Sequence, residues 1–173
     1  MPDSVLSQAI KEAYASAPAG VVIYNTIELR HPAFDAPIRV VRDTVDLSAT
    51  LEASAPANPS TLVTFVAFAF DFSKPEVNAT GIPQITIEID NVDRSIVASI
   101  EKALTTTDLV QCTYREFIST DLTAPQNNPP LSMTIISVSA TTLRVTAVAS
   151  FPNLMNIRFP KTEYDTTVFP GLV

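Results

Sequence analysis

One short stretch of the sequence combines residue types that could bind a metal ion or transfer a proton. In ITIEIDNVDRSIVASI (85–100), Asp90, Asn91 and Asp93 lie between two apolar runs. A calcium-binding loop needs alternating oxygen ligands, a glycine and a closing glutamate, and this stretch lacks the glycine. The apolar residues change here from a period of two to a helical spacing. We therefore predict a strand followed by a helix over about 92–104, with Asp90 or Asn91 as its N-cap and Asp93 in its first turn.

Other groups that could do chemistry are few. A serine-histidine-aspartate triad would have to use His31, the only histidine, which precedes a proline in a predicted turn and is expected to face solvent or cap that turn. Cys112 alternates with Val110 and Tyr114 on one face of a predicted strand, which favours a small core residue. Carboxylate pairs occur at Asp90 and Asp93, Asp43 and Asp46, and Glu163 and Asp165, as in any acidic chain. We therefore expect no enzymatic activity, no metal and no cofactor.

The composition limits the partners of the protein. The 173 residues carry a formal net charge of -7, with a sequence pI of about 4.5. Phosphate backbones repel such a surface, so sequence-specific binding to nucleic acid is not expected. The longest apolar run, around Leu62 to Phe72, is too short to cross a bilayer as a helix. The N-terminus lacks a basic-then-apolar signal pattern, so we expect a soluble protein without a stable membrane anchor.

Two helices and about eight strands must position these residues. Residues 4–17 carry one apolar stripe at helical spacing, with Asp3 or Ser4 as the cap. The chain then alternates with a period of two, and the strands are predicted in VVIYNTIELR, IRVVRD, DLSATLEA, TLVTFVAFAFDF, ITIEID, DLVQCTYREFIST, LSMTIISVSA and TLRVTAVASF. The last two strands should form a hairpin. A proline-rich loop, DLTAPQNNPP, should be ordered by its neighbours or else be mobile.

The strand TLVTFVAFAFDF is apolar on both faces, which predicts that it is covered on both sides. Its cover could be the domain's own helices or a neighbouring subunit. The segment 151–173 contains three Phe-Pro pairs, which continue neither a helix nor a central strand, and we predict an extended C-terminal arm. Candidates for subunit contacts are Phe68, Phe70, Phe72, Phe151, Phe159 and Phe169.

These elements predict a single mainly β domain over 1–173. The expected form is an antiparallel β-sandwich or curled barrel, with an N-terminal helix and one inserted helix packed on it.

Several segments of the sequence, in the same order, resemble those of a known family. They are LSQAIKEAYASAP, IELRHPAF, IRVVRDTVDL, FVAFAFDFSKPE, ITIEIDNVDRSIV and the terminal RFPKTEY and FPGL. The chain resembles phage and prophage minor tail proteins of unassigned activity, whose genes lie in the tail-tip cluster. The resemblance covers Leu6 to Leu172 and includes the junction residues Asp90, Asn91, Asp93 and Arg94. It brings no catalytic residues with it.

The resemblance implies a virion protein of a long, non-contractile tail, made in the host cytoplasm. It would work at the distal tail or baseplate hub. The two-faced apolar strand, the proline-rich loop and the Phe-Pro tail further predict a homo-oligomeric ring, a hexamer more readily than a trimer. Its other partners would be the tail tube, the tape-measure protein and further tail-tip proteins. Two other roles stay open: a tail assembly chaperone absent from the virion, and a module that binds carbohydrate or a receptor on the host surface.

Overall fold

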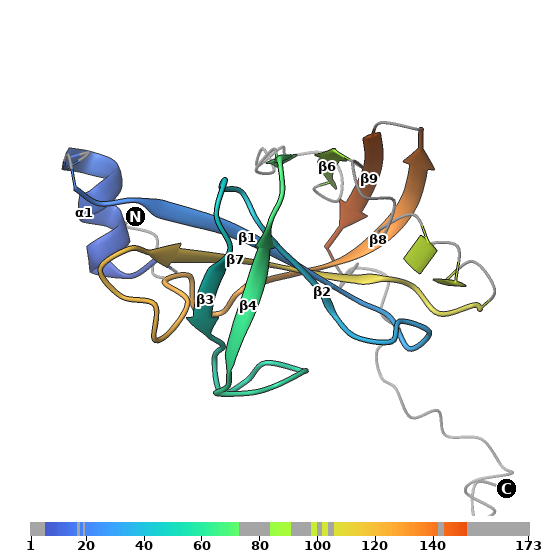
Figure 1. The fold of residues 1–173 in the computed structure, drawn as a ribbon, viewed down its shortest axis with the longest axis horizontal. Helices are drawn as coiled ribbons and strands as arrows, with labels where there is room; N and C mark the ends of the chain where they lie inside the picture. Colours follow the sequence, from blue (N-terminus) through green and yellow to red (C-terminus); the bar gives the residue numbers. More distant parts are fainter. Residues whose placement is uncertain are drawn as a thin grey trace, which may run out of the picture.

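The computed structural model describes residues 6–16, 18, 20–72, 84–90, 98–99, 102–103, 106–141 and 144–151. These residues form a helix, α1 (Gln8–Ser16), and a sheet of nine strands (Figure 1). The strands are β1 (Ile23–Arg30), β2 (Ile38–Val41), β3 (Leu47–Thr50), β4 (Leu62–Ala67), β5 (Phe70–Phe72), β6 (Gln84–Asp90), β7 (Gln111–Ile118), β8 (Leu131–Ala140) and β9 (Arg144–Ser150). The prediction of a mainly β chain with an N-terminal helix is confirmed.

Hydrogen bonds join the strands in the order β3-β4-β2-β1-β7-β8-β9-β6-β5. All neighbouring pairs are antiparallel except β2 and β4, which run parallel. The predicted hairpin is confirmed, since Ala140 at the end of β8 pairs with Val145 at the start of β9. Strand β7 lies at the centre of the order and pairs with β1 along its whole length.

The sheet curls so that its inner face encloses the main core. Side chains from β1, β2, β5, β6, β7, β8 and β9 pack there in one apolar cluster. Phe72, on the last strand of the order, stacks on Tyr114 of the central strand, with ring centroids 4.2 Å apart. In the described residues no strand pairing joins β3 to β5, the two ends of the strand order. The sheet is therefore curled and open, and the closed barrel among the expected forms is not present.

The apolar run TLVTFVAFAFDF forms two strands where one was predicted. Strand β4 pairs with β2, whereas β5 pairs with β6, and Phe68 and Ala69 link the two strands. On β4, Val63 and Phe65 are buried, but Leu62 is 66 % exposed and Val66 is 47 % exposed. Cover by the domain's own helices is therefore wrong for this part of β4. The reason is that Val63 and Phe65 pack on the chain's own β2 and β7, whereas Leu62 and Val66 lie on the opposite side of β4.

A second core lies on the outer face of the sheet. The buried sides of β3 and β4 pack there against Val41 of β2 and Phe117 of β7. The Phe65 and Phe117 rings lie 5.8 Å apart at a tilt of 58°. Strand β7 is consequently buried on both faces, with every residue from Cys112 to Ile118 buried.

Helix α1 begins later than predicted. Ser7 is its N-cap, because its Oγ accepts a hydrogen bond from the Ile10 N–H at 3.3 Å. Leu6 forms a β-bridge with Asn127 and so cannot belong to the helix. Only Ile10 and Ala13 are buried on the helix. The predicted caps Asp3 and Ser4 lie outside the described residues.

The proline-rich loop is ordered by its neighbours. Asn127 is buried; its side-chain amide donates to the Tyr114 carbonyl and its Oδ1 accepts from the Glu116 N–H. Gln126 bonds to Ser7 through both backbone and side chain. The loop therefore ties the start of α1 to the end of β7.

The predicted inserted helix is described only in part. Residues 98–99 and 102–103 are helical, and the rest of 92–104 lies outside the described residues. Within the part of the chain that the structure describes, no helix is long and apolar enough to span a bilayer.

Candidate functional site

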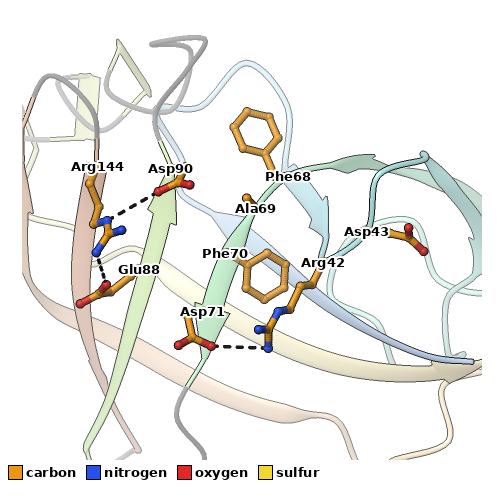
Figure 2. A pocket seen from close by; sticks show the side chains of 9 residues that line it. All are labelled: Arg42, Asp43, Phe68, Ala69, Phe70, Asp71, Glu88, Asp90 and Arg144. Atoms are coloured by element: carbon orange, nitrogen blue, oxygen red, sulfur yellow. Dashed lines mark hydrogen bonds and ion pairs between the residues drawn. The ribbon is translucent and has the colours of Figure 1, made fainter.

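A pocket of about 350 Å³ lies between the residues that follow β2 and the strands β5, β6 and β9 (Figure 2). We call it the seam pocket. Its walls come from the end of β2, the link between β4 and β5, and the strands β5, β6 and β9. The lining residues are Arg42, Asp43, Phe68, Ala69, Phe70, Asp71, Glu88, Asp90 and Arg144.

The seam pocket is charged, and its ion pairs join neighbouring strands. Arg144 Nη1 lies 2.8 Å from Glu88 Oε2, and its Nε lies 3.5 Å from Asp90 Oδ1, which ties β9 to β6. Arg42 Nη1 lies 3.4 Å from Asp71 Oδ1, across the gap between β2 and β5 (Figure 2). Among the described residues that line the pocket, four carboxylates face two guanidinium groups. The pocket therefore favours a cationic group.

Asp90, predicted as a cap, belongs to this pocket. It is the last residue of β6, and its N–H donates to the Ala69 carbonyl at 3.0 Å. Its carboxylate points toward Arg144 (Figure 2). Asn91 and Asp93 lie outside the described residues, so the predicted helix cap stays a prediction.

The predicted subunit-contact residues have different positions in the chain's own fold. Phe70 is buried in the main core. Phe68, Phe72 and Phe151 are partly buried and pack against that core, and Phe68 also lines the seam pocket. Phe159 and Phe169 lie outside the described residues. Contact with another subunit stays a prediction for all of these phenylalanines.

Cys112 is a core residue, as predicted. It is fully buried on the inner face of the sheet. Burial, with a smaller contribution from the Glu28 charge, raises the pKa of the Cys112 thiol to about 12. Because the thiolate is the nucleophilic form, the folded protein keeps this group unreactive near neutral pH.

His31 caps a turn, as expected, but it does not face solvent. Its Nδ1 accepts a hydrogen bond from the Ala33 N–H, and its Nε2 lies 3.1 Å from the Asp108 carbonyl. Thr106 Oγ1 is 3.2 Å from the same nitrogen. The ring therefore joins the turn after β1 to the segment before β7.

A buried ionic network lies on the outer face of the sheet and was not predicted. Arg115 of β7 donates two hydrogen bonds of 2.8 Å to the Glu52 carboxylate. Glu28 of β1 is fully buried, 2.7 Å from Arg39 and 3.7 Å from Arg115. Arg39 also donates to Asn58 Oδ1. The network fastens the loop between β3 and β4 to the centre of the sheet.

Across the described ranges, no three histidine, cysteine, aspartate or glutamate side chains gather in a way that could hold a metal ion. The paired carboxylates Asp43 and Asp46 accept backbone hydrogen bonds from Thr44 and Ala67. The seam pocket offers charge and an aromatic ring on an open surface.

Comparisons with known proteins identify one family. Residues 9–164 match the family described as a domain of unknown function, DUF1833. No curated protein matches the sequence.

Proposed function

This chain belongs to the family described as a domain of unknown function, DUF1833, and we propose that it is a structural subunit of a phage tail tip. In this role it forms a homo-oligomeric ring, a hexamer more readily than a trimer, at the distal tail or baseplate hub below the tail tube. The resemblance to minor tail proteins supports this role, and its extent from Leu6 to Leu172 includes residues 9–164 of the family match.

The observation that carries the proposal is the uncovered side of the β3–β4 hairpin. We call this surface the hairpin face; it consists of Leu62, Thr64 and Val66 on β4 and Ser48 on β3, all exposed and uncharged. Val45, beside it in sequence, is 70 % exposed. Two copies of an acidic chain repel each other least where an uncharged surface is buried between them. The hairpin face is therefore where a neighbouring subunit packs.

The two-layered architecture of the hairpin supports the same role. The hairpin of β3 and β4 packs over the outer face of β2 and β7 through its second core. These two packed layers correspond to the sandwich expected for the fold. One side of the hairpin then contacts its own chain and the other side is left for the next subunit.

The ring subunit is favoured over a module that binds carbohydrate. Sugar-binding surfaces stack the sugar on exposed aromatic rings. Tyr114 is buried in the core, and Tyr24 is partly buried against the second core. Tyr14 on α1 is 50 % exposed and Tyr164 lies outside the described residues, so among the described tyrosines it is those of the sheet that offer no exposed stacking surface.

Analysis of purified virions tests the proposal. Mass spectrometry should detect the protein in virions in an amount that matches a ring, whereas an assembly chaperone would be absent from them. Particles made without the gene product should have incomplete tails or tails without a tip in electron micrographs. Normal, infectious tails in its absence would contradict the structural role.

A further inference from the structure

We propose that the buried ionic network on the outer face of the sheet binds one internal water molecule, held by Glu28 and Arg30 of β1 and by Arg115 of β7. This is the network that fastens the loop between β3 and β4 to the centre of the sheet. The inference concerns the chain's own fold and does not depend on the proposed assembly.

Three buried polar atoms converge at one point of this network. Among the described residues, Glu28 Oε1, Arg30 Nε and Arg115 Nη1 are buried and make no hydrogen bond. Arg30 Nε lies 3.3 Å from Glu28 Oε1, and Arg115 Nη1 lies 3.7 Å from the same oxygen. Both contacts are ion pairs without the geometry of a hydrogen bond. Because a buried polar group without a hydrogen bond is costly, such atoms normally share a partner.

The other polar atoms of Glu28 and Arg115 are already bonded, and this keeps the two side chains from closing on each other. Glu28 Oε2 accepts a hydrogen bond of 2.7 Å from Arg39 Nε. Arg115 uses its Nε and Nη2 for the two bonds of 2.8 Å to the Glu52 carboxylate. A rotation that brought Arg115 Nη1 onto Glu28 would weaken these bonds. The third partner must therefore be a small molecule between them.

The chemistry of the three atoms selects water. Arg30 Nε–H and Arg115 Nη1–H are donors, whereas Glu28 Oε1 is an acceptor. A water molecule accepts two hydrogen bonds and donates to the carboxylate, which satisfies all three atoms. An anion such as chloride has no hydrogen to donate and is repelled by Glu28. A metal cation would meet one carboxylate oxygen and two positively charged groups.

The water completes a hydrogen-bonded circuit that clamps the loop between β3 and β4. On one side Glu28 holds Arg39, and Arg39 donates to Asn58 of the loop. On the other side the water links Glu28 to Arg115, which holds Glu52 at the start of the same loop. Both ends of the circuit therefore lie in one loop, and the water joins its two halves.

A crystal structure of the full-length protein tests the inference directly. We expect density for one water within about 2.7–3.2 Å of all three atoms. Crystals grown with bromide separate water from an anion, because bromide scatters X-rays anomalously. An anomalous peak at the site, a side chain in its place, or direct hydrogen bonds from the two arginines to Glu28 Oε1 would each overturn the inference.

Oxygen-17 magnetic relaxation dispersion gives a second measurement in solution, because it detects internal waters with long residence times. The side chain of Arg30 is 25 % exposed, whereas those of Glu28 and Arg115 are fully buried, so Arg30 is the contact that can be removed with the least damage to the fold. Arg30→Met should shorten the residence time of one internal water by about tenfold or more, the effect of losing one hydrogen bond to a charged group.

Arg42→Met is the matched control, since Arg42 is 53 % exposed and pairs with Asp71 in the seam pocket. This variant should leave the dispersion profile unchanged. A folded Arg30→Met protein with the profile of the unmodified protein, or equal changes in the two variants, would show that Arg30 holds no internal water.

Discussion

At the scale of single residues, the main stabilising polar feature is the buried Arg115, which holds the loop carboxylate of Glu52 and faces the fully buried Glu28. Removing one partner of a buried ion pair leaves the other charge without compensation in a medium that solvates it poorly. Arg115→Met should therefore lower the free energy of unfolding by about 3–5 kcal/mol, measured by urea denaturation.

The exposed pair in the seam pocket supplies the matched control. Arg144 is about half exposed, and its pair with Glu88 is open to solvent. Arg144→Met should cost at most about 1 kcal/mol. Equal losses for the two variants would mean that the buried network contributes no more than a surface ion pair.

Cys112 provides a second test at this scale. Because its thiol has a pKa of about 12 and is fully buried, alkylation by iodoacetamide at pH 8 should be slower than for an ordinary thiol by roughly 10³-fold or more. Unfolding in urea should restore the ordinary rate. Rapid modification of the native protein would show that the inner core opens to reagent.

The raised pKa of Cys112 also predicts a pH dependence of stability. As pH rises above the ordinary thiol value of about 8.5, the unfolded chain loses this proton while the folded chain keeps it. The stabilisation is complete below the unfolded value and is lost as pH approaches about 12. Cys112→Ala should make the decline in unfolding free energy between these values less steep.

At the scale of elements, the loop between β3 and β4 contains a strained residue. Ser60 has a φ of 50°, in the left-handed region that favours glycine. Ser60→Gly should therefore raise the free energy of unfolding by about 0.5–1 kcal/mol. This is the steric cost that the glycine removes, minus the entropy that the more flexible glycine adds to the unfolded chain. Thermal unfolding measures the change.

The control for this prediction is a serine in extended backbone. Ser48 is exposed like Ser60 but belongs to β3. Ser48→Gly should destabilise the protein by about 0.5–1 kcal/mol. A loss of stability in both variants would indicate that the Ser60 conformation carries no strain.

The sequence predicted most strands because their residues alternate with a period of two. Ile85, Ile87 and Ile89 are buried as that pattern indicates. The pattern could not show that TLVTFVAFAFDF breaks at Phe68, because the break follows from a change of strand partner that only the sheet order reveals.

The same limit explains the unpredicted polar network. Glu28 and Arg30 alternate with apolar residues, and this pattern is the same for a face in water and a face covered by a loop. Only the strand register places Arg39 opposite Glu28. The seam pocket likewise depends on residues after β2 lying close to β5, β6 and β9, which local patterns do not contain.

At the scale of the whole molecule, the hairpin face is the predicted contact between subunits. Val66→Lys places a charge on that uncharged surface and should abolish self-association without lowering the melting temperature by more than a few degrees. Sedimentation and circular dichroism measure the two effects.

Val22→Lys is the matched control, since Val22 is 50 % exposed but precedes β1 and bonds to Ser119 after β7, so it is not part of the hairpin face. This variant should assemble as the unmodified protein does. If both lysine variants assemble normally, the ring uses another surface.

The central position of β7 has a consequence for synthesis on the ribosome. Strand β1 pairs along its whole length with β7, and Thr26 is separated from its partner Arg115 by 89 positions in the chain. At a translation rate of about 5–20 residues per second, β1 waits roughly 4–18 s for this partner. During that interval β7 is not yet available to pair with β1, and the apolar side of β1 lacks this partner. The central pairing of the sheet therefore forms only after most of the polypeptide has been made, although β1 can pair with β2 earlier.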